Sequence, residues 1–301
     1  MSSACAKFIL GGEHSVVSRG RAIAFPIPDL RLRFSNSSTN HDVVPRYEFI
    51  LNGELRSEGE RLLLEELCRK LGIKNAPWCF HIDSQIPIGS GLGSSAALCV
   101  ALTRNFFPEL SPEEQAVVAY KGEELFHRRA SGIDPFTIAL DRPIVFRAAD
   151  QSFRYLETSA FNKSPYCFVL VDSGSTHNTK QVQDAVHQTR TLNPLIYEDL
   201  MTTLSSNVEL MLPAFESANT RTLAGLMKDS HFRLIQLGVS NDAINDLCAK
   251  LESYDSCLAA KITGAGCGGF VLGLVEKNRL LEFRSSVKRD FGNDKVVIDC
   301  T

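Results

Sequence analysis

The sequence predicts an α+β fold in two lobes, and three observations indicate this class. Short β-rich runs alternate with turns in the first third of the chain, and longer segments of helical periodicity fill much of the second half. Further strand-like runs follow those helical segments. With 301 residues and 44% apolar content, the chain is long enough to bury two closely packed lobes, which we place at residues 1–160 and 161–301.

The first third is predicted to contribute strands of one sheet and one amphipathic helix. The strands are expected where short β-rich runs lie between turns, at residues 7–10, 31–34, 47–51 and 79–83. Leucines at helical spacing predict the helix over 58–71, and Gly72 supplies its C-terminal stop. A further helix opens at Pro112, because Ser111 can cap it and Glu114 completes a capping box.

The second half is predicted to pack helices on a smaller antiparallel sheet. An apolar run at 166–171 indicates a buried strand, and periodic segments between residues 179 and 251 indicate several helices. Further strands are expected at 259–262, 270–275 and 295–298, around a last helix at 280–291. Neither a repeat nor an obvious linker is found, and the lobe boundary is expected near residues 150–165.

Composition favours a small-molecule role over nucleic-acid or membrane binding. The chain has 32 basic and 35 acidic residues, a formal charge of −3 and no long run of either sign. Its nine cysteines are never spaced as CxxC, so we expect reduced thiols and neither a disulfide framework nor a zinc site. No stretch approaches the roughly 18 uncharged apolar residues of a membrane span. We therefore expect a soluble, cytoplasmic protein.

A glycine-rich segment at residues 87–97, PIGSGLGSSAA, predicts an anion-binding turn that leads into a helix at 96–106. Glycines let the backbone approach a ligand closely, and a helix N-terminus offers free N–H groups and a partial positive charge to a phosphate. The segment lacks the Gly-Lys-Ser/Thr of a Walker A loop and the last glycine of a Rossmann fingerprint. An ordinary tight turn is the alternative interpretation.

Three motifs in this order resemble those of the GHMP kinases, and most of all the mevalonate kinase branch of that family. They are AKFILGGEHSVV at residues 6–17, the glycine-rich segment, and KITGAGCGG at residues 261–269. The resemblance spans nearly the whole chain and implies the two-lobed GHMP kinase fold, with a ribosomal S5-like N-terminal lobe and a ferredoxin-like C-terminal lobe. It further implies ATP and mevalonate as substrates and Mg²⁺ as cofactor. A homodimer is left open.

The resemblance also assigns residues to the phosphates and the metal ion. The phosphate-binding residues that it implies are Ser84, Gly89, Ser90, Gly91, Leu92, Gly93, Ser94 and Ser95. Ser95 and Glu123 match the family's metal-ligating hydroxyl and carboxylate. Helical spacing puts Glu123 on a mostly apolar face with Ala116 and Ala119, whereas Glu124 falls on a solvated face. A buried carboxylate needs a partner, and an arginine is the alternative to magnesium.

Asp134 lies in SGIDP at residues 131–135, which is similar to the family's SGxD signature. Asp followed by Pro is also typical of a helix N-cap, so capping is the alternative role of Asp134. The resemblance implies that Asp134 is the catalytic carboxylate, which accepts a hydrogen bond or the proton from the acceptor hydroxyl. Lys7, inside an apolar strand pattern, matches the family's catalytic lysine and would favour the alkoxide.

Acceptor binding is assigned to residues of both terminal motifs and of one helix. The residues implied are Lys7, Glu13, His14, Thr179, Gly264 and Ala265. Thr179 also suits a helix cap, and the glycines near 264 also suit a tight turn. HRRAS at residues 127–131 replaces the family's usual His-Gly-x-Pro-Ser. Its two arginines suit a phosphorylated acceptor, so phosphomevalonate phosphorylation stays open, as does a catalytically silent relative that binds a nucleotide or metabolite.

Overall fold

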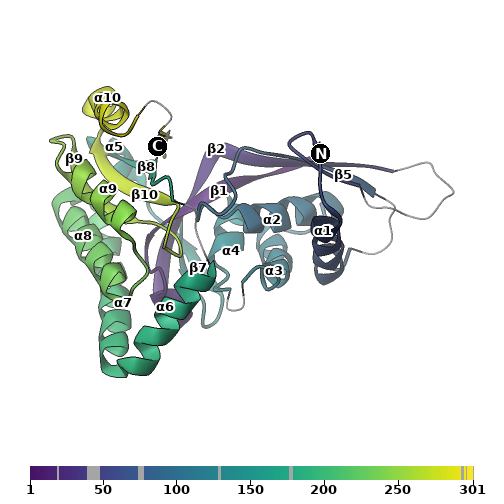
Figure 1. The fold of residues 1–301 in the computed structure, drawn as a ribbon, viewed down its shortest axis with the longest axis horizontal. Helices are drawn as coiled ribbons and strands as arrows, with labels where there is room; N and C mark the ends of the chain where they lie inside the picture. Colours follow the sequence, from purple (N-terminus) through teal and green to yellow (C-terminus); the bar gives the residue numbers. More distant parts are fainter. Residues whose placement is uncertain are drawn as a thin grey trace. The chain divides into compact units, whose positions relative to one another are not determined.

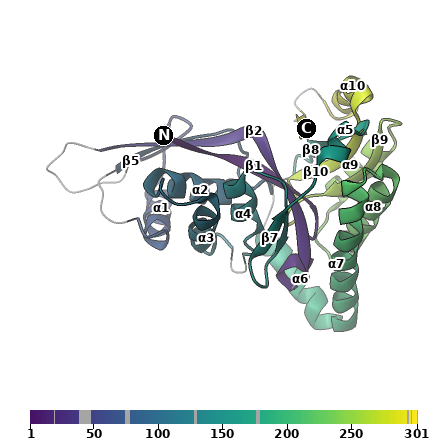
Figure 2. The same ribbon diagram turned by 180° about the vertical axis from the view of Figure 1, so that it is seen from behind.

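The computed structural model describes residues 1–18, 20–38, 48–73, 78–127, 130–175, 179–292, 295 and 297–300. The chain divides into two compact units (Figures 1 and 2). Unit 1 consists of Met1–Lys7, Pro26–Ile88 and Gly93–Arg142, and unit 2 consists of Phe8–Phe25, Gly89–Leu92 and Pro143–Thr301. These segments interleave along the chain, a feature that the sequence analysis did not anticipate. The predicted functional division at residue 160 stays a prediction.

One sheet contains, in this order, β4 (Glu54–Leu55), β3 (Glu48–Leu51), β5 (Trp78–Ser84) and β2 (Arg21–Ser38). The part of β2 from Pro26 onwards belongs to unit 1, and its first residues belong to unit 2. Strand β3 runs parallel to β5, and β5 runs antiparallel to β2. Strand β1 (Ser2–Gly11) also pairs with β2. The four predicted strands are therefore confirmed as members of one sheet, although β1 and β2 are longer than predicted and Tyr47 lies outside the described residues.

Four helices of unit 1 lie together along one face of these strands (Figures 1 and 2). They are α1 (Glu58–Lys70), α2 (Ser94–Phe106), α3 (Pro112–Glu123) and α4 (Ile133–Leu140). The capping box of α3 is confirmed, because the Ser111 hydroxyl accepts from the Glu114 N–H and the Glu114 carboxylate accepts from the Ser111 N–H. Helix α2 begins two residues before its predicted start, so Ser94 and Ser95 lie in its first turn.

Unit 2 contains a four-stranded antiparallel sheet in the order β11 (Val297–Asp299), β8 (Tyr166–Asp172), β10 (Phe270–Glu276) and β9 (Cys257–Ile262). It also contains β6 (Ile144–Arg147) and β7 (Ser152–Tyr155), which continue the other sheet, because β6 pairs with residues 21–24 of β2 and with β7. Its α-helices are α5 (Ser159–Lys163), α6 (Thr179–Leu192), α7 (Pro194–Glu216), α8 (Thr220–Gln236), α9 (Asp242–Glu252) and α10 (Leu280–Phe291). The predicted helices with a smaller antiparallel sheet are confirmed.

Both faces of the four-stranded sheet are buried within unit 2. One face packs with α8 and α9 in a core whose sheet residues include Val171, Ile262 and Val271. On the opposite face Phe168 packs against Phe8, Phe25 and Phe215, with ring centroids 5.5, 5.5 and 6.2 Å away. Phe8 and Phe25 stack at 5.0 Å. Residues 8–25 therefore belong to unit 2 because their aromatic side chains complete its core.

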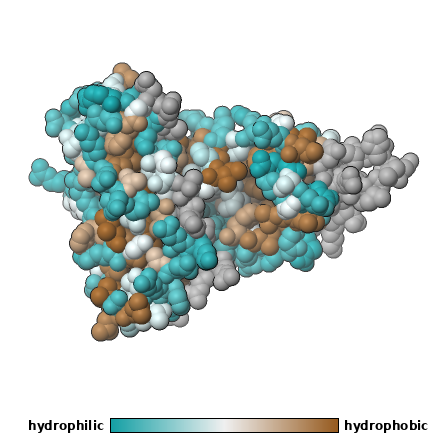
Figure 3. All heavy atoms as spheres, viewed as in Figure 1, coloured by the Kyte–Doolittle hydropathy of each residue, from teal (hydrophilic) through white to brown (hydrophobic). Residues whose placement is uncertain are grey.

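The surface in Figure 3 is largely hydrophilic, with apolar side chains scattered among the polar ones. In unit 2, apolar side chains gather where α6 joins α7, and Leu192, Leu195 and Ile196 are 66%, 86% and 54% exposed. Within the described part of the chain, every helix is too short or too polar to span a membrane.

The aromatic cluster provides a test of the unit 2 core. Phe168→Ala should lower the free energy of unfolding by about 3–5 kcal/mol, because it removes a buried ring and leaves a cavity. The matched control is Phe232→Ala on α8, where the side chain is 53% exposed and the expected change is within about 0.5 kcal/mol. Denaturant unfolding of both variants measures the difference, and equal losses would contradict this packing.

Candidate functional site

Lys7 and Asp134 form an ion pair inside unit 1. The Lys7 Nζ lies 3.1 Å from the Asp134 Oδ1, and the two side chains are 2% and 22% exposed. Lys7 comes from β1 and Asp134 from the first turn of α4. The ammonium is thus buried beneath a carboxylate that solvent can reach.

The structure rules out helix capping as the role of Asp134. The N-cap of α4 is Gly132, in the left-handed conformation with φ +90°, and no side chain caps this helix. The Ser131 hydroxyl accepts a hydrogen bond from the Ile133 N–H at 3.3 Å, which holds the turn before the helix. Asp134 is therefore available for chemistry, whereas Arg128 and Arg129 lie outside the described residues.

Glu123 occupies the buried face of α3, as helical spacing predicted. Its neighbours on that face, Ala116 and Ala119, are fully buried, and Glu123 itself is 3% exposed. Glu124 lies on the solvated side, where its carboxylate is 55% exposed and 3.3 Å from the Lys70 Nζ. Two adjacent glutamates of one helix therefore experience opposite environments.

The Glu123 carboxylate is only partly compensated. It forms a hydrogen bond with Ser95, and its Oε2 lies 4.0 Å from the His127 Nε2. Its buried Oε1 has no hydrogen-bond partner among the described residues. Burial raises the pKa of Glu123 to about 7, with the Asp134 charge adding to the rise, while Ser95 and then Lys7 oppose it. The predicted alternative of an arginine partner finds no support in the described part of the chain, where no arginine pairs with Glu123.

The donors at this position fit a magnesium ion. Mg²⁺ prefers oxygen ligands and usually takes only one or two from the protein, with phosphates and water supplying the rest. The Ser95 hydroxyl and the unpaired Glu123 oxygen match that requirement, since a cation would satisfy the orphaned Oε1. No larger group of His, Cys, Asp or Glu suited to a metal occurs among the described residues.

Glycines bring two backbone segments of unit 2 into contact. A Cβ on Gly264 would lie 3.0 Å from the Gly91 carbonyl oxygen, and one on Gly269 would lie 2.2 Å from the Ser90 oxygen. Any larger residue would push the segments apart. The predicted phosphate turn therefore packs directly on the C-terminal glycine motif, as a tight backbone arrangement rather than two separate loops.

The glycine-rich segment then enters unit 1 at the start of α2. Gly93 is the N-cap of this helix, with φ +81° and no side-chain cap. A Cβ on Gly93 would lie 3.1 Å from the Lys7 Cε, so glycine leaves room for the lysine. The N–H groups of the first turn of α2, which contains Ser94 and Ser95, receive no side-chain cap and suit an anion.

The residues assigned to the acceptor gather in unit 2, apart from Lys7 in unit 1 and Thr179, whose side chain lies outside the described part. Glu13 forms a buried ion pair with Lys261. The His14 Nε2 hydrogen-bonds the Ala265 carbonyl oxygen at 2.8 Å, and His14 adopts φ +62°. Lys261 opens the C-terminal glycine motif, and the resemblance implied no role for it. A charge inside an apolar strand pattern is the signal that could have identified it.

Ser84 is the predicted residue whose contacts least resemble a binding site. Its hydroxyl accepts from the Ile86 N–H at 3.2 Å, and its own N–H donates to the Asn52 Oδ1 at 2.7 Å. The first bond closes the turn after β5, and the second ties the end of β5 to the turn between β3 and β4. A nucleotide contact by Ser84 stays a prediction.

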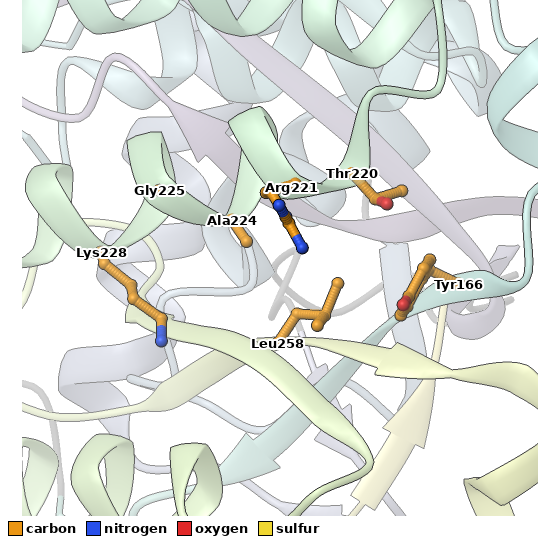
Figure 4. A pocket seen from close by; sticks show the side chains of 7 residues that line it. All are labelled: Tyr166, Thr220, Arg221, Ala224, Gly225, Lys228 and Leu258. Carbon is orange, nitrogen blue, oxygen red and sulfur yellow. The ribbon is translucent and has the colours of Figure 1, made fainter.

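A hollow of about 440 Å³ in unit 2 involves none of the predicted residues (Figure 4). It is lined by Tyr166, Thr220, Arg221, Ala224, Gly225, Lys228 and Leu258. Lys228 lies 3.4 Å from Glu252 and is largely exposed, and no carboxylate lines the hollow. Without a carboxylate it offers neither a carboxylate base nor a magnesium ligand of that kind, so its size alone does not make it the reactive site.

Comparison with known proteins places the chain in a family. Residues 60–142 match the GHMP kinases N terminal domain, and residues 211–293 match the GHMP kinases C terminal description. The mevalonate kinase of Pyrococcus horikoshii is 31% identical over 96% of this chain and 92% of its own length. That of Archaeoglobus fulgidus is 31% identical over 91% of this chain and 92% of its own. The chain belongs to the GHMP kinase family.

Solved structures confirm the two-lobed α+β fold of this GHMP kinase. The L. major mevalonate kinase in complex with R-mevalonate has a TM-score of 0.78 at 21% identity, covering 99% of this chain and 94% of that one. The Methanococcus jannaschii mevalonate kinase has a TM-score of 0.77 at 23% identity, covering 99% and 96%. Within the family, the sequence is most like the mevalonate kinases.

The raised pKa of Glu123 gives the GHMP kinase a measurable stability signature. The folded state holds a proton on Glu123 between its ordinary pKa of 4.5 and about 7, so this group destabilises the fold as the pH rises through that window. Glu123→Gln should therefore be more stable than the unchanged protein at pH 8, by up to about 3 kcal/mol, and the gain should shrink below pH 5. Chemical denaturation without Mg²⁺ across this pH range measures it.

The matched control is Glu124→Gln, one residue further along the chain. Its exposed carboxylate should give a stability difference that varies little with pH. Parallel curves for the two variants would show that Glu123 titrates as an ordinary surface glutamate.

Proposed function

We propose that this GHMP kinase transfers the γ-phosphoryl group of ATP to the primary hydroxyl of mevalonate, giving 5-phosphomevalonate and ADP. Its mevalonate kinase relatives cover nearly the whole chain and support this acceptor. The observation that carries the chemistry is the Lys7–Asp134 pair, in which a buried cation holds a reachable carboxylate. Kinase catalysis depends on positioning and on electrostatic stabilisation, and this pair offers both.

In the proposed reaction Asp134 accepts a hydrogen bond from the acceptor hydroxyl and takes its proton. The hydroxyl oxygen forms a bond to the γ-phosphorus while the bond from that phosphorus to the bridging oxygen of ADP breaks. Lys7 stabilises the developing negative charge on the attacking oxygen and keeps the Asp134 carboxylate in place. The proton then leaves Asp134 for solvent.

The phosphates of ATP are assigned to residues 89–95. The free backbone N–H groups of the first turn of α2 point out of its N-terminal end, where the helix dipole favours negative charge. Ser90 and Ser94 would add hydroxyl donors, and the glycines leave space for the phosphate oxygens. The close contact between Gly93 and Lys7 supports a common role for this turn and the ion pair.

Ser95 and Glu123 would hold Mg²⁺, which when bound neutralises the charge on the phosphate oxygens. Support comes from the orphaned Oε1 of Glu123 and from its hydrogen bond with Ser95. The mevalonate itself is assigned to Glu13, His14, Thr179, Gly264 and Ala265, together with Lys7.

The choice of acceptor has a direct test. With ATP and Mg²⁺, the purified protein should release ADP in the presence of mevalonate and not with phosphomevalonate, homoserine or galactose. A coupled ADP assay with the four acceptors side by side measures this. Turnover with phosphomevalonate alone would overturn the proposed acceptor and make Arg128 and Arg129 its phosphate ligands, whereas no turnover with any acceptor would favour a silent binding protein.

The role of Asp134 is tested at the two ends of α4. Asp134→Asn should lower kcat by about 10²–10⁴-fold, because the amide cannot take the proton. The matched control is Asp141→Asn at the C-cap of the same helix, which makes the same change in charge. The Asp141 side chain is 37% exposed, and its Oδ2 lies 3.3 Å from the Arg31 guanidinium. This variant should keep kcat within about threefold. Steady-state kinetics on both folded variants decides the matter, and equal values would remove Asp134 from the chemistry.

A further inference from the structure

Lys261 is a charged residue at a fully buried strand position, where apolar residues are usual. It lies in β9, opposite Leu272 of β10, and its side chain is fully buried. Its chain neighbours Ala260 and Ile262 belong to the core on the other face of the sheet. Desolvating an ammonium group is costly, so this lysine needs a compensating partner.

The partner is Glu13, and the pair is isolated from water. The Lys261 Nζ contacts the Glu13 Oε1, and the two side chains are 0% and 1% exposed. The same nitrogen donates to the Ile262 carbonyl oxygen at 2.6 Å. The nearby His231 adds no competing charge, because burial and then the Lys261 charge lower its pKa to about 4. A buried ion pair is often no more stabilising than a well-packed apolar pair, so stability alone does not explain these two residues.

The ion pair belongs to a set of contacts that hold the turn after β1. The Ile9 N–H donates to the Thr263 hydroxyl, which donates back to the Ile9 carbonyl oxygen, both at 2.9 Å. His14, at φ +62°, hydrogen-bonds the Ala265 carbonyl oxygen. The short stretch 261–265 therefore fixes residues 9–14, and Lys261 supplies its one charged contact among the described residues.

The ion pair uses only one of the two Glu13 oxygens. Its Oε2 is buried and has no hydrogen-bond partner among the described residues. An unsatisfied buried carboxylate oxygen is costly, and a ligand hydroxyl would satisfy it. The ion pair thus holds the carboxylate by one oxygen, and the other oxygen is buried with its hydrogen-bonding capacity unmet by the described residues.

We propose that Lys261 is a positioning residue for the acceptor: it fixes Glu13 so that the free carboxylate oxygen accepts a hydrogen bond from a hydroxyl of the acceptor. This inference rests on the proposed function, in which Glu13 binds the acceptor. Lys261 need not touch the substrate. Its effect on acceptor affinity passes through Glu13.

The test compares Lys261→Met, Glu13→Gln and the double variant. Lys261→Met should raise KM for mevalonate about tenfold or more, with KM for ATP and kcat within about threefold, because acceptor binding and not chemistry is lost. Glu13→Gln should raise the same KM. In the Glu13→Gln background, adding Lys261→Met should change that KM less than about twofold, since coupled residues are not additive. The double variant carries no buried charge at this pair and should fold even if Lys261→Met does not.

Val275→Ala is the matched control for lost packing. Val275 is fully buried in β10, and its truncation should lower the melting temperature while leaving KM for mevalonate unchanged. An unchanged KM in Lys261→Met would overturn the proposal, and so would independent, multiplying effects of Lys261→Met and Glu13→Gln.

Amide hydrogen exchange separates this proposal from the choice of acceptor. Without any substrate, Lys261→Met should speed exchange at residues 9–16 relative to the unchanged protein and to Val275→Ala. If the unchanged protein fails to turn over mevalonate yet this local effect appears, the proposed function fails while Lys261 still positions the turn. Protection equal to that of the unchanged protein would refute the positioning role.

Discussion

Burial of charge on apolar elements is the constraint on which the rest of this structure depends. Lys7, Glu13, Glu123 and Lys261 are each at most 3% exposed, although desolvating an ion costs several kcal/mol. Three of them are held by an ion pair of opposite charge within their own unit. Each pair fixes one strand against one turn or helix start. The two ion pairs therefore fix the backbone segments that carry their residues.

The glycines allow two backbone segments to approach each other closely. The segment 89–92 packs on the C-terminal glycine motif at distances that leave no space for a Cβ on Gly269 or Gly264. Within unit 1, Gly93 at the start of α2 makes room for Lys7. Most of the donors proposed for the phosphates are therefore main-chain N–H groups, which the packed glycine turn holds in place. A site built in this way loses little entropy on binding, because its donors are already ordered.

Periodicity predicted the elements well because each depends on local residues. The buried face of α3, its capping box and the antiparallel sheet of unit 2 follow directly from spacing and caps. The catalytic role proposed for Asp134 did not, since the residues Asp-Pro alone favour an N-cap and only the left-handed Gly132 shows where α4 begins. Glu123 was placed on the correct face, but its unpaired oxygen depends on which side chains approach from α2.

Features that depend on contacts far apart in sequence escaped prediction. The ion pair between Glu13 and Lys261 joins residues that are 248 positions apart, and no local pattern links them. The interleaving of the two units has a similar origin, because Phe8 and Phe25 complete an aromatic core around Phe168. The strand pattern could identify Lys261 as a charged residue within an apolar strand, but it could not identify Glu13 as its partner.

Glu123 also bears on whether the chain is an enzyme or a silent binding relative. Because its pKa is about 7, Glu123 is partly ionised at neutral pH, and burial of that charge destabilises the fold. Glutamine at this position would keep the shape of the side chain and remove that cost. A protein that only bound a metabolite would gain from such a change, since most proteins tolerate stabilising substitutions outside their active sites. A buried carboxylate that is only partly compensated, beside Ser95, Lys7 and Asp134, instead fits the proposed cation-assisted phosphoryl transfer.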